Sequence, residues 1–534
     1  MMHLEQAYWP AVRDTELVET TVGALLRDRA AAHGEHVALV GVRHDTGATE
    51  RLTYAELFDE ASRVAAALSA LTPAGGLVAL WAPNVIEWPI IQYGAALAGM
   101  VLVALNPVLR DEELEYALSH SRAALLLHAE ASRDYPMGEV ARRVCARLPQ
   151  LRRISLSEST TWRAAAAEPV SVPGDPDAVA MLQYTSGTTG KPKGVALTHR
   201  ALVNVARLTM EALQVPPAAV ALNPLPMFHT AGCVIATLGP LWVGGTVVLA
   251  EKFVPQVVLD QLRSEAAEVL FYVPTILAAL LEQQRGSAEP APRLRIIMGG
   301  ASEVSPTLID GAAEVFGAEV FNLYGQTELA PVLTLTRPED SRDDRLNTVG
   351  RPLPHVDCKI IDPDTQEVLP VGAEGEICAR GYQQFVEYLH DPQATARALD
   401  RDGFVRTGDL GRMDERGFVT VTGRLKELII RGGENIAPVA VEGALSKVDP
   451  EIDVVVLGLP DEKFGEIVAA VLCAGGGVDQ AAKDRFLSHA RDRLAAHTVP
   501  ARWFAARDLP VTPTGKVQRF VLRDAILRNE IPEL

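Results

Sequence analysis

The feature that most constrains this chain is a glycine- and hydroxyl-rich stretch, YTSGTTGKPKG, at positions 184–194. It offers four aliphatic hydroxyls, three glycines and two lysines within eleven residues. Glycines let backbone N–H groups approach an anion closely, and successive N–H groups together with hydroxyls form an anion-binding nest. The spacing G-x-x-x-x-G-K-[ST] of a Walker loop is absent. We therefore predict a polyphosphate-binding loop of another kind.

The residues on either side of this loop predict regular secondary structure. An apolar strand is expected over 181–184, and a short strand followed by a helix over 195–213, with Thr198 as the helix N-cap. The alternative interpretation is a flexible Ser/Gly/Thr linker. A loop fixed between a strand and a helix favours a binding site over a spacer.

Strand–helix alternation over residues 76–170 predicts a mostly parallel sheet with helices on its faces. Between 320 and 422 the helical periodicity fades, and short strands and turns predict a β-rich subdomain. After Gly423 a compact α+β pattern begins. We expect an α/β protein with a large N-terminal domain, residues 1–425, of parallel-rich sheets flanked by helices. A small α+β C-terminal domain is expected over 426–534.

Composition limits the partners and the compartment. The formal net charge of −18 argues against a broad nucleic-acid footprint and against binding to anionic membranes. The five cysteines are scattered without a C-x-x-C pair, and the N-terminus lacks signal-peptide features, so a cytoplasmic protein with free thiols is expected. Two uncharged runs, 88–107 and 233–250, contain glycines and are predicted as helix, turn and strand, not as membrane spans.

Three further motifs are expected where strands end. They are NPLPMFHTAG at 223–232, IIMGGAS at 296–302 and FNLYGQTE at 321–328. In open α/β sheets, ligands bind at the carboxyl ends of the strands. The three motifs together therefore predict one ligand site at a sheet edge, although each alone is a weak signal.

Individual side chains in these motifs indicate a nucleotide. Tyr324 could stack on a flat ring that lies against backbone glycines. Glu328 beside a triphosphate would hold Mg²⁺ through hard oxygen ligands. A lone histidine is usually a core residue, but small residues follow His229 and leave space for a pocket wall. Asp409, in RTGD, and Arg424 are interpreted either as a grip on a ribose diol or as a surface ion pair in a hairpin.

In this order, YTSGTTGKPKG, NLYGQTE, TGD, GRLKELI and PTGK resemble the adenylate-forming superfamily over essentially the whole chain. That superfamily comprises acyl- and aryl-CoA ligases, peptide-synthetase adenylation domains and beetle luciferases, and the acyl/aryl-CoA ligases are the most similar group. The resemblance implies ATP and Mg²⁺ as cofactors, CoA as the acceptor substrate, and a mobile C-terminal domain.

The resemblance also implies roles for particular residues. The pyrophosphate end of ATP is assigned to Thr185, Ser186, Gly187, Thr188, Thr189 and Lys193. The adenine is assigned to Gly300, Ala301, Asn322 and Tyr324, and Ser302 and Gly325 are further residues assigned to cofactor binding. The α-phosphate is assigned to Thr327, the metal to Glu328 and Thr185, and the ribose to Asp409 and Arg424. Lys426 is the implied hinge. The implied catalytic residues are Lys516, Glu328, Thr185 and His229.

The implied reaction explains why such residues are needed. A carboxylate is a poor electrophile, and its attack on the α-phosphorus of ATP gives an acyl-adenylate and pyrophosphate. Two anions must meet, so positioning and charge neutralisation dominate catalysis. In the second step, rotation about Lys426 would bring Gly432 and Gly433 to a pantetheine tunnel, and Phe464 would pack on CoA. The residues at 497–500, HTVP, depart from the Tyr-Lys pair of many CoA ligases, which removes one contact to a CoA phosphate.

The acid is predicted to be hydrophobic. In amino-acid-activating relatives an aspartate near the start of the pocket motif pairs with the α-ammonium, and here FHTAG contains no carboxylate. The pocket residues implied are His229, Gly232, Val234, Gly299, Gly325, Leu329 and Ala330. An apolar pocket suits a fatty, aryl or polycyclic acid.

Several alternatives stay open. The acyl group could pass to a carrier protein or a separate partner in place of CoA. A regulator that binds nucleotide or acyl groups without turnover is the alternative of another class, and intact Glu328 and Lys516 argue against it. A luciferase-like oxygenase and a homodimer are not excluded by the sequence.

Overall fold

The computed structural model describes residues 3–73, 75–158, 174–185, 192–300, 304–431, 434–461, 463–512 and 517–534. Contacts divide the chain into two compact units. The larger unit comprises Pro10–Cys358 and Ala379–Val405. The smaller unit comprises Met1–Trp9, Lys359–Cys378 and Arg406–Leu534. The domain boundary at 425/426 stays a prediction.

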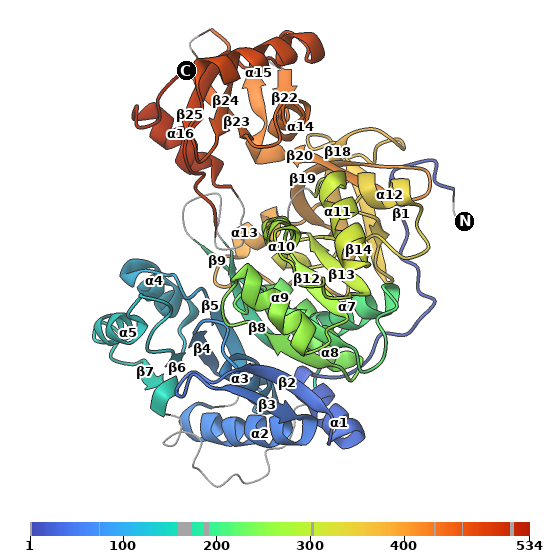
Figure 1. Cartoon of the computed structure of the whole chain (residues 1–534). Helices are drawn as coiled ribbons and strands as arrows, with labels where there is room; N and C mark the ends of the chain where they lie inside the picture. Colours follow the sequence, from blue (N-terminus) through green and yellow to red (C-terminus); the bar gives the residue numbers. More distant parts are fainter. Residues whose placement is uncertain are drawn as a thin grey trace. The chain divides into compact units, whose positions relative to one another are not determined.

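The first sheet of the larger unit has six strands in the order β7-β6-β4-β5-β8-β9. Its strands are β4 (Leu77–Trp81), β5 (Val101–Leu105), β6 (Leu125–His128), β7 (Arg152–Ser155), β8 (Val179–Thr185) and β9 (Lys193–Thr198). All neighbours are parallel except β8 and β9. Its helices are α3 (Glu87–Leu97), α4 (Asp111–Ser121) and α5 (Met137–Cys145). Figure 1 shows α4 and α5 side by side near β6 and β7.

The second sheet has nine strands in the order β16-β15-β14-β13-β12-β10-β11-β2-β3. They are β2 (Val37–Val42), β3 (Thr49–Thr53), β10 (Val220–Asn223), β11 (Thr246–Leu249), β12 (Val269–Tyr272), β13 (Ile296–Gly300), β14 (Glu319–Tyr324), β15 (Thr334–Leu335) and β16 (Arg351–Pro352). The pairs from β14 to β2 are parallel, and the outer strands are antiparallel. The predicted parallel-rich sheets are confirmed.

Helices cover the nine-stranded sheet. They are α1 (Val22–His33), α2 (Tyr54–Leu71), α7 (His199–Ala212), α8 (Ala236–Trp242), α9 (Pro255–Ser264), α10 (Pro274–Arg285) and α11 (Pro306–Phe316), with the short α12 (Arg342–Asn347) and α13 (Pro392–Arg397) beyond them. Figure 1 shows α9, α10 and α11 following one another along the part that contains β12 to β14. With helices on its faces, a parallel strand is buried on both sides, which explains apolar runs such as β12, whose four residues are all buried.

Local sequence signals explain where several helices begin. The Thr21 side chain accepts a hydrogen bond from Ala24 N, and Thr53 with Glu56 forms a capping box at the start of α2. Both uncharged runs fold as predicted: α3 is followed by β5, and α8 is followed by β11. No helix in the described part of the chain is long and apolar enough to cross a membrane.

Two further sheets lie mostly or wholly in the smaller unit. One has the order β1-β17-β18-β19-β20, with β1 (Tyr8–Trp9), β17 (Val356–Ile361), β18 (Gly375–Gly381), β19 (Val405–Met413) and β20 (Val419–Arg424). The other contains β21 (Ile429–Arg431), β22 (Glu434–Ile436), β23 (Asp453–Asp461), β24 (Gly465–Cys473) and β25 (Arg502–Ala506). Its helices are α14 (Pro438–Leu445), α15 (Gln480–Arg493) and α16 (Arg519–Leu527).

The predicted α+β pattern after Gly423 is thus confirmed, and Pro438 is the first residue of α14. Helix α15 ends at Arg493, because its C-cap, Leu494, is already in extended conformation. Two apolar clusters form the core of this part. One includes Phe486 of α15 and Trp503, and the other includes Phe504 and Leu522 of α16.

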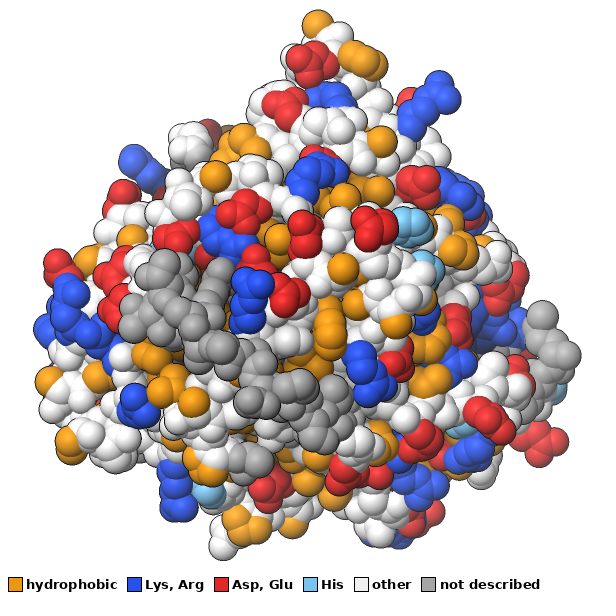
Figure 2. Space-filling view, turned by 90° about the horizontal axis from the view of Figure 1, so that it is seen from below, with side chains coloured by type: hydrophobic (Ala, Val, Ile, Leu, Met, Phe, Trp, Pro, Cys, Tyr) orange, Lys and Arg blue, Asp and Glu red, His pale blue; other side chains and the backbone are white. Residues whose placement is uncertain are grey.

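The surface carries charges of both signs. Figure 2 shows one face on which Lys and Arg side chains are interspersed with Asp and Glu side chains. The described side chains form no continuous basic field on that face.

Candidate active site

The loop predicted to bind polyphosphate begins and ends on two paired strands. β8 ends at Thr185 and β9 begins at Lys193, and these two residues are direct partners in the antiparallel register. Helix α7 follows at once, and the Thr198 hydroxyl accepts a hydrogen bond of 3.1 Å from Ala201 N. The predicted strand before the loop, and the strand and capped helix after it, are confirmed, whereas residues 186–191 lie outside the described part of the chain.

Helix α4 anchors both ends of this loop. The Tyr184 hydroxyl donates to Ala117 O at 3.1 Å and lies 3.0 Å from His120 Nδ1. The Tyr116 hydroxyl donates to Pro192 O at 3.0 Å. Burial raises the pKa of Tyr184, so its hydroxyl stays protonated as a donor. Tyr184 and Pro192, at the two ends of the loop, are therefore both hydrogen-bonded to α4.

Glu328 and Lys193 both contact Tyr388, a residue outside every motif identified in the sequence. The Tyr388 hydroxyl donates to Glu328 Oε1 at 2.7 Å, and Lys193 Nζ lies 4.5 Å from the centre of the Tyr388 ring. Burial, and then the negative charge of Glu328, raise the pKa of Tyr388. One aromatic side chain thus contacts both the cation and the carboxylate that were predicted to handle ATP.

The donor set at Glu328 fits Mg²⁺. This ion binds through one or two carboxylates together with substrate phosphates, and seldom in a cage made only of protein groups. In the part of the chain that is described, no group of three or more His, Cys, Asp and Glu side chains could hold a metal. Glu328 and Thr185 as the protein ligands of a magnesium ion that arrives on the nucleotide stay a prediction.

The predicted strand-end residues share one edge of the nine-stranded sheet. Strands β10, β12, β13 and β14 are parallel neighbours, so their carboxyl ends lie on the same side. Added side-chain atoms would collide there: a Cβ on Gly299 would lie 1.9 Å from Tyr272 O, and one on Gly300 would lie 2.1 Å from Leu323 O. Close strand packing by itself requires these glycines, whether or not a ligand lies on them.

Asn322 is strongly tied to the protein. Its Oδ1 accepts from the Tyr272 hydroxyl at 2.8 Å, and its Nδ2 donates to Arg345 O at 3.3 Å. Its backbone N–H donates to the Thr336 hydroxyl at 3.0 Å. The amide keeps further donor and acceptor capacity, so contact with an adenine stays a prediction.

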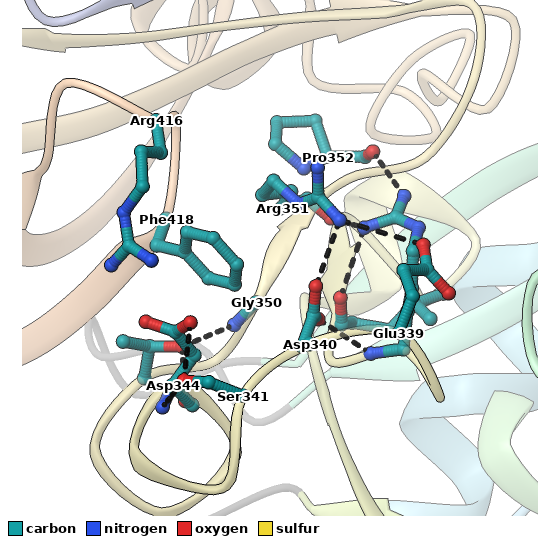
Figure 3. A network of polar contacts seen from close by, with 12 residues as sticks. Glu339, Asp340, Ser341, Asp344, Gly350, Arg351, Pro352, Arg416 and Phe418 are labelled. Carbon is teal, nitrogen blue, oxygen red and sulfur yellow. Dashed lines mark hydrogen bonds and ion pairs between the residues drawn. The ribbon is translucent and has the colours of Figure 1, made fainter. Parts of the chain in front are cut away.

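The segment after β14 is braced by the polar network in Figure 3. Arg351 pairs with Asp340 at 2.8 Å and with Glu339 at 3.5 Å. The half-buried guanidinium of Arg337 donates to Pro352 O at 2.7 Å. Burial, and then the charge of Arg351, lower the pKa of Arg337 to about 10. The network stabilises β15 and β16 next to the strand that carries Asn322 and Tyr324.

His229 lies beyond the end of its strand. We expected it at the end of an apolar strand, but β10 ends at Asn223, and the ring lies in the turn before the π-helix Ala231–Ile235. Its Nδ1 accepts a hydrogen bond of 3.1 Å from Ala231 N, so the proton of the neutral ring is on Nε2. Burial lowers the pKa of His229 to about 4. The side chain is therefore a neutral donor through Nε2.

The other predicted pocket residues differ in accessibility. Val234, Leu329 and Ala330 have 0% exposed surface, so they line no water-sized space in this conformation. Gly232 is also buried, and a Cβ there would lie 2.2 Å from Pro226 O. His229, Gly299 and Gly325 are partly exposed. An acid-binding chamber lined by all seven residues stays a prediction.

In the smaller unit, Asp409 and Arg424 are paired across β19 and β20. Arg424 Nε donates to Asp409 Oδ1 at 2.7 Å, and the two side chains are 36% and 12% exposed. The ion pair expected under one interpretation is therefore present. It does not exclude the other, because a carboxylate has lone pairs left for a ribose diol.

The implied hinge residue, Lys426, lies in a single 3₁₀ turn, Leu425–Glu427. Its neighbour Glu427 is bound by Arg519 at 2.9 Å, and Arg519 also pairs with Glu442 of α14 at 2.7 Å. Burial alone would lower the pKa of Arg519, but the carboxylates of Glu442 and Glu427 outweigh it and raise the pKa. No sequence motif indicated this clamp, which joins the turn to α14 and α16.

Two cations lie close to the Phe464 ring. The Arg431 guanidinium is 4.7 Å and the Lys463 ammonium 4.9 Å from the centre of its ring. Arg431 also donates to His497 O at 2.9 Å. Strands β21 and β22 form an antiparallel hairpin on either side of Gly432 and Gly433.

Nine predicted site residues lie outside the described part of the chain. They are Ser186, Gly187, Thr188, Thr189, Ala301, Ser302, Gly432, Gly433 and Lys516. Their roles stay predictions. One described neighbour of the site is unsatisfied: the buried Thr230 hydroxyl has no hydrogen-bond partner among the described residues. An unpaired buried hydroxyl is unfavourable, and such groups often mark functional sites.

Comparisons with known proteins agree with this arrangement. The putative acyl-CoA synthetase YngI of Bacillus subtilis (strain 168) is 33% identical, over 95% of this chain and 97% of its own length. The ATP-bound crystal structure of MatB from Rhodopseudomonas palustris superposes with a TM-score of 0.85 at 29% identity, covering 95% of this chain and 99% of MatB. The o-succinylbenzoate CoA synthetase MenE of Bacillus subtilis, in complex with its acyl-adenylate intermediate, gives 0.81 at 29% identity, with 94% and 98% covered.

Family models cover both parts of the chain. The model described as AMP-binding enzyme matches residues 26–389, which include the loop after β8, Glu328 and Tyr388. The model described as AMP-binding enzyme C-terminal domain matches residues 440–516, which end at Lys516. With these matches, the motifs in order, and Glu328 and Lys193 both in contact with Tyr388, the chain belongs to the family of AMP-binding, adenylate-forming enzymes.

Proposed function

We propose that this enzyme is an AMP-forming acid–thiol ligase that activates a hydrophobic carboxylic acid with ATP and transfers the acyl group to CoA. The products of the first step are an acyl-adenylate and pyrophosphate, and those of the second are acyl-CoA and AMP. A fatty, aryl or polycyclic acid is the proposed substrate class.

The observation that carries the proposal is the grouping of Lys193, Tyr388 and Glu328 at the end of the loop after β8. Lys193 places a positive charge where the loop ends, and it would neutralise the departing pyrophosphate. Glu328 would hold Mg²⁺, which supplies further charge neutralisation when bound. Lys516 would bring the substrate carboxylate and the α-phosphate together.

Two features support a hydrophobic acid. His229 is neutral at physiological pH and donates through Nε2, so it can bind a carboxylate oxygen without pairing with an ammonium. Val234, Leu329 and Ala330, which are predicted pocket residues, are apolar and buried. Their side chains offer no hydrogen-bond partner to a polar group on a substrate. An α-amino acid is therefore a poor substrate in this proposal.

The surroundings of Phe464 support CoA as the acceptor. The residues at 497–500 lack the lysine present in many CoA ligases, but Arg431 and Lys463 place two cations on the Phe464 ring, and Arg431 binds His497 O. An aromatic ring with two cations close to it suits a nucleotide, because the ring can contact the base and the cations can contact phosphates. The names of the similar proteins, which are acyl-CoA or aryl-CoA synthetases, agree with this acceptor.

The compartment proposed is the cytoplasm. All five cysteines are free, and four of them are buried. Burial raises the pKa of the Cys358 thiol to about 12, so it stays a protonated, unreactive thiol. Free thiols of this kind persist in a reducing compartment.

The test is pyrophosphate release across a panel of fatty, aryl, polycyclic and amino acids, with and without CoA, and with thioester measured by mass spectrometry. The proposal expects pyrophosphate and an acyl-CoA thioester with a hydrophobic acid. Pyrophosphate without thioester would favour transfer to a carrier protein or another partner. The absence of ATP cleavage with every acid would favour the non-catalytic regulator and defeat the proposal.

A further inference from the structure

We propose that Tyr388 is a positioning residue that fixes Glu328 relative to Lys193 and so couples the binding of magnesium to the binding of ATP. The inference rests on the proposed function, in which Lys193 contacts phosphate and Glu328 holds the metal. None of the sequence motifs contains Tyr388, which lies in EYLHDP at 387–392.

The backbone around Tyr388 is paired with the strand that leaves the loop. Val195 and Tyr388 form an antiparallel bridge. Leu389 N donates to Gly194 O at 2.8 Å, and Ala196 N donates to Glu387 O at 3.0 Å. This ladder begins one residue after Lys193, so the Tyr388 ring and the Lys193 side chain are held in a set register.

The same segment is tied separately to the turn that carries Glu328. Phe385 N donates to Glu328 O at 2.9 Å, and the rings of Phe385 and Tyr388 lie 4.9 Å apart. Tyr388 N donates to the Thr395 hydroxyl at 2.9 Å. Tyr388 is only 9% exposed, so packing restricts its side chain. The segment therefore connects the loop strand to Glu328 through its backbone as well as through the phenol.

Tyrosine combines the two properties that this position uses. Its ring face attracts the Lys193 ammonium 4.5 Å away, and its hydroxyl donates to Glu328 Oε1 at 2.7 Å. The bond to Oε1 orients the carboxylate and leaves Oε2 able to bind a metal, because each carboxylate oxygen has its own lone pairs. The two properties can be separated by mutation: phenylalanine keeps the ring without the donor, and leucine lacks both.

The experiment measures ATP binding by calorimetry in the absence of carboxylic acid, with EDTA and with saturating Mg²⁺. The variants are Tyr388→Phe and Tyr388→Leu. Tyr135→Phe is the matched control, because the Tyr135 ring also takes a cation, Arg110 at 4.4 Å, and its hydroxyl donates to Leu109 O at 2.9 Å. The quantity compared is the factor by which Mg²⁺ strengthens ATP binding.

In Tyr388→Phe we expect this factor to fall about tenfold while the affinity in EDTA is unchanged, since one hydrogen bond to a charged group is lost. In Tyr388→Leu we expect the affinity in EDTA to fall as well, because Lys193 loses its contact with the ring. Tyr135→Phe should match the wild type in both conditions.

An unchanged magnesium factor in Tyr388→Phe would overturn the proposal. If that variant also had a lower thermal midpoint than Tyr135→Phe, the role of Tyr388 would be structural only. Failure of the proposed function would look different. The wild type would bind ATP in a magnesium-dependent way, but it would release no pyrophosphate with any of the acids tested.

Discussion

The two units of this protein hold their candidate site residues by different forces. In the larger unit, Lys193 and Glu328 are held mainly by backbone pairing, through β8, β9 and the segment that contains Tyr388. In the smaller unit, the turn with Lys426 is held by side-chain ion pairs from Arg519. In the larger unit these two residues thus lie on a frame of paired backbone. In the smaller unit the turn depends on contacts between charged side chains.

This difference has a physical consequence. Buried backbone ladders respond little to salt, whereas ion pairs with partly exposed side chains are screened. Arg519, Glu427 and Glu442 are 19%, 27% and 16% exposed in their side chains, so solvent reaches them in part. A hinge next to such a clamp could be adjusted without disturbing the ATP-binding frame, in keeping with the proposed rotation about Lys426.

The largest expected effect comes from overpacking the frame. Gly299→Ala would place a methyl group 1.9 Å from Tyr272 O, and the strands β12 and β13 would have to separate. We expect the larger unit to lose about 3 kcal/mol or more of stability. Thermal unfolding and hydrogen exchange of peptides from β12 and β13 would measure the loss.

The matched control lies in the other unit. Gly443 is inside α14, and among the described residues no atom outside its neighbours and the helix's own nearby backbone lies within 4 Å of the position that its Cβ would take. Gly443→Ala should stabilise the protein by about 0.5–1 kcal/mol through helix propensity. If both variants had the same effect, the distinction between the tightly packed sheet and the open helix position would be wrong.

The next effect separates chemistry from binding. Lys516→Ala should raise the barrier to acyl-adenylate formation by about 3 kcal/mol, the scale of one lost oxyanion donor, while ATP binding to the larger unit is retained. Single-turnover pyrophosphate release and calorimetric ATP binding would measure the two steps. Lys193→Ala is the contrast, since we expect it to weaken ATP binding itself. An unchanged release rate in Lys516→Ala would remove this lysine from the catalytic step.

The charge-dependent clamp gives a smaller effect. Arg519→Met leaves the carboxylates of Glu427 and Glu442 without their cation and should cost about 2 kcal/mol, below the value for fully buried pairs because solvent reaches all three groups. The loss should shrink as salt is raised. Unfolding of the wild type and the variant at low and high ionic strength would test this, and a loss independent of salt would contradict an electrostatic clamp.

The smallest effect concerns pH and the larger unit. His199 is 2% exposed, and its Nδ1 accepts from Val22 N at 3.3 Å. Burial lowers its pKa to about 4, against a weaker opposite effect of Asp175. The unfolded histidine, with a pKa of about 6.5, takes up a proton before the folded one, so stability falls as the pH drops below about 6.5.

Between about pH 7.5 and about pH 5.5 this single group should remove about 1 kcal/mol of stability, and the loss should level off near pH 4. The measurement is the unfolding free energy at each pH for the wild type and His199→Gln. The variant should lack this component. Parallel curves for the two proteins would show that His199 does not titrate in this way.

Much of the fold could be predicted from the sequence because its signals are local. The N-caps Thr21 and Thr198, the Pro438 helix start and the apolar strands all depend on residues within a few positions of one another. Contacts between side chains on distant segments were harder to predict. Asn322 was predicted to face adenine. Its side-chain amide forms hydrogen bonds with Tyr272 and Arg345, which lie on other elements, and no local sequence pattern indicates these contacts.

By itself, the sequence determined the glycine-rich loop, the alternation of strands and helices, and the ordered motifs that identify the family. Those properties depend on residue type and spacing, which the chain carries without folding. Only the tertiary structure decided that Tyr388 joins Lys193 to Glu328 and that Arg519 joins Glu427 to Glu442. Such contacts arise when strands and helices far apart in the sequence pack together, because a side chain meets its partner only once the backbone has set their register.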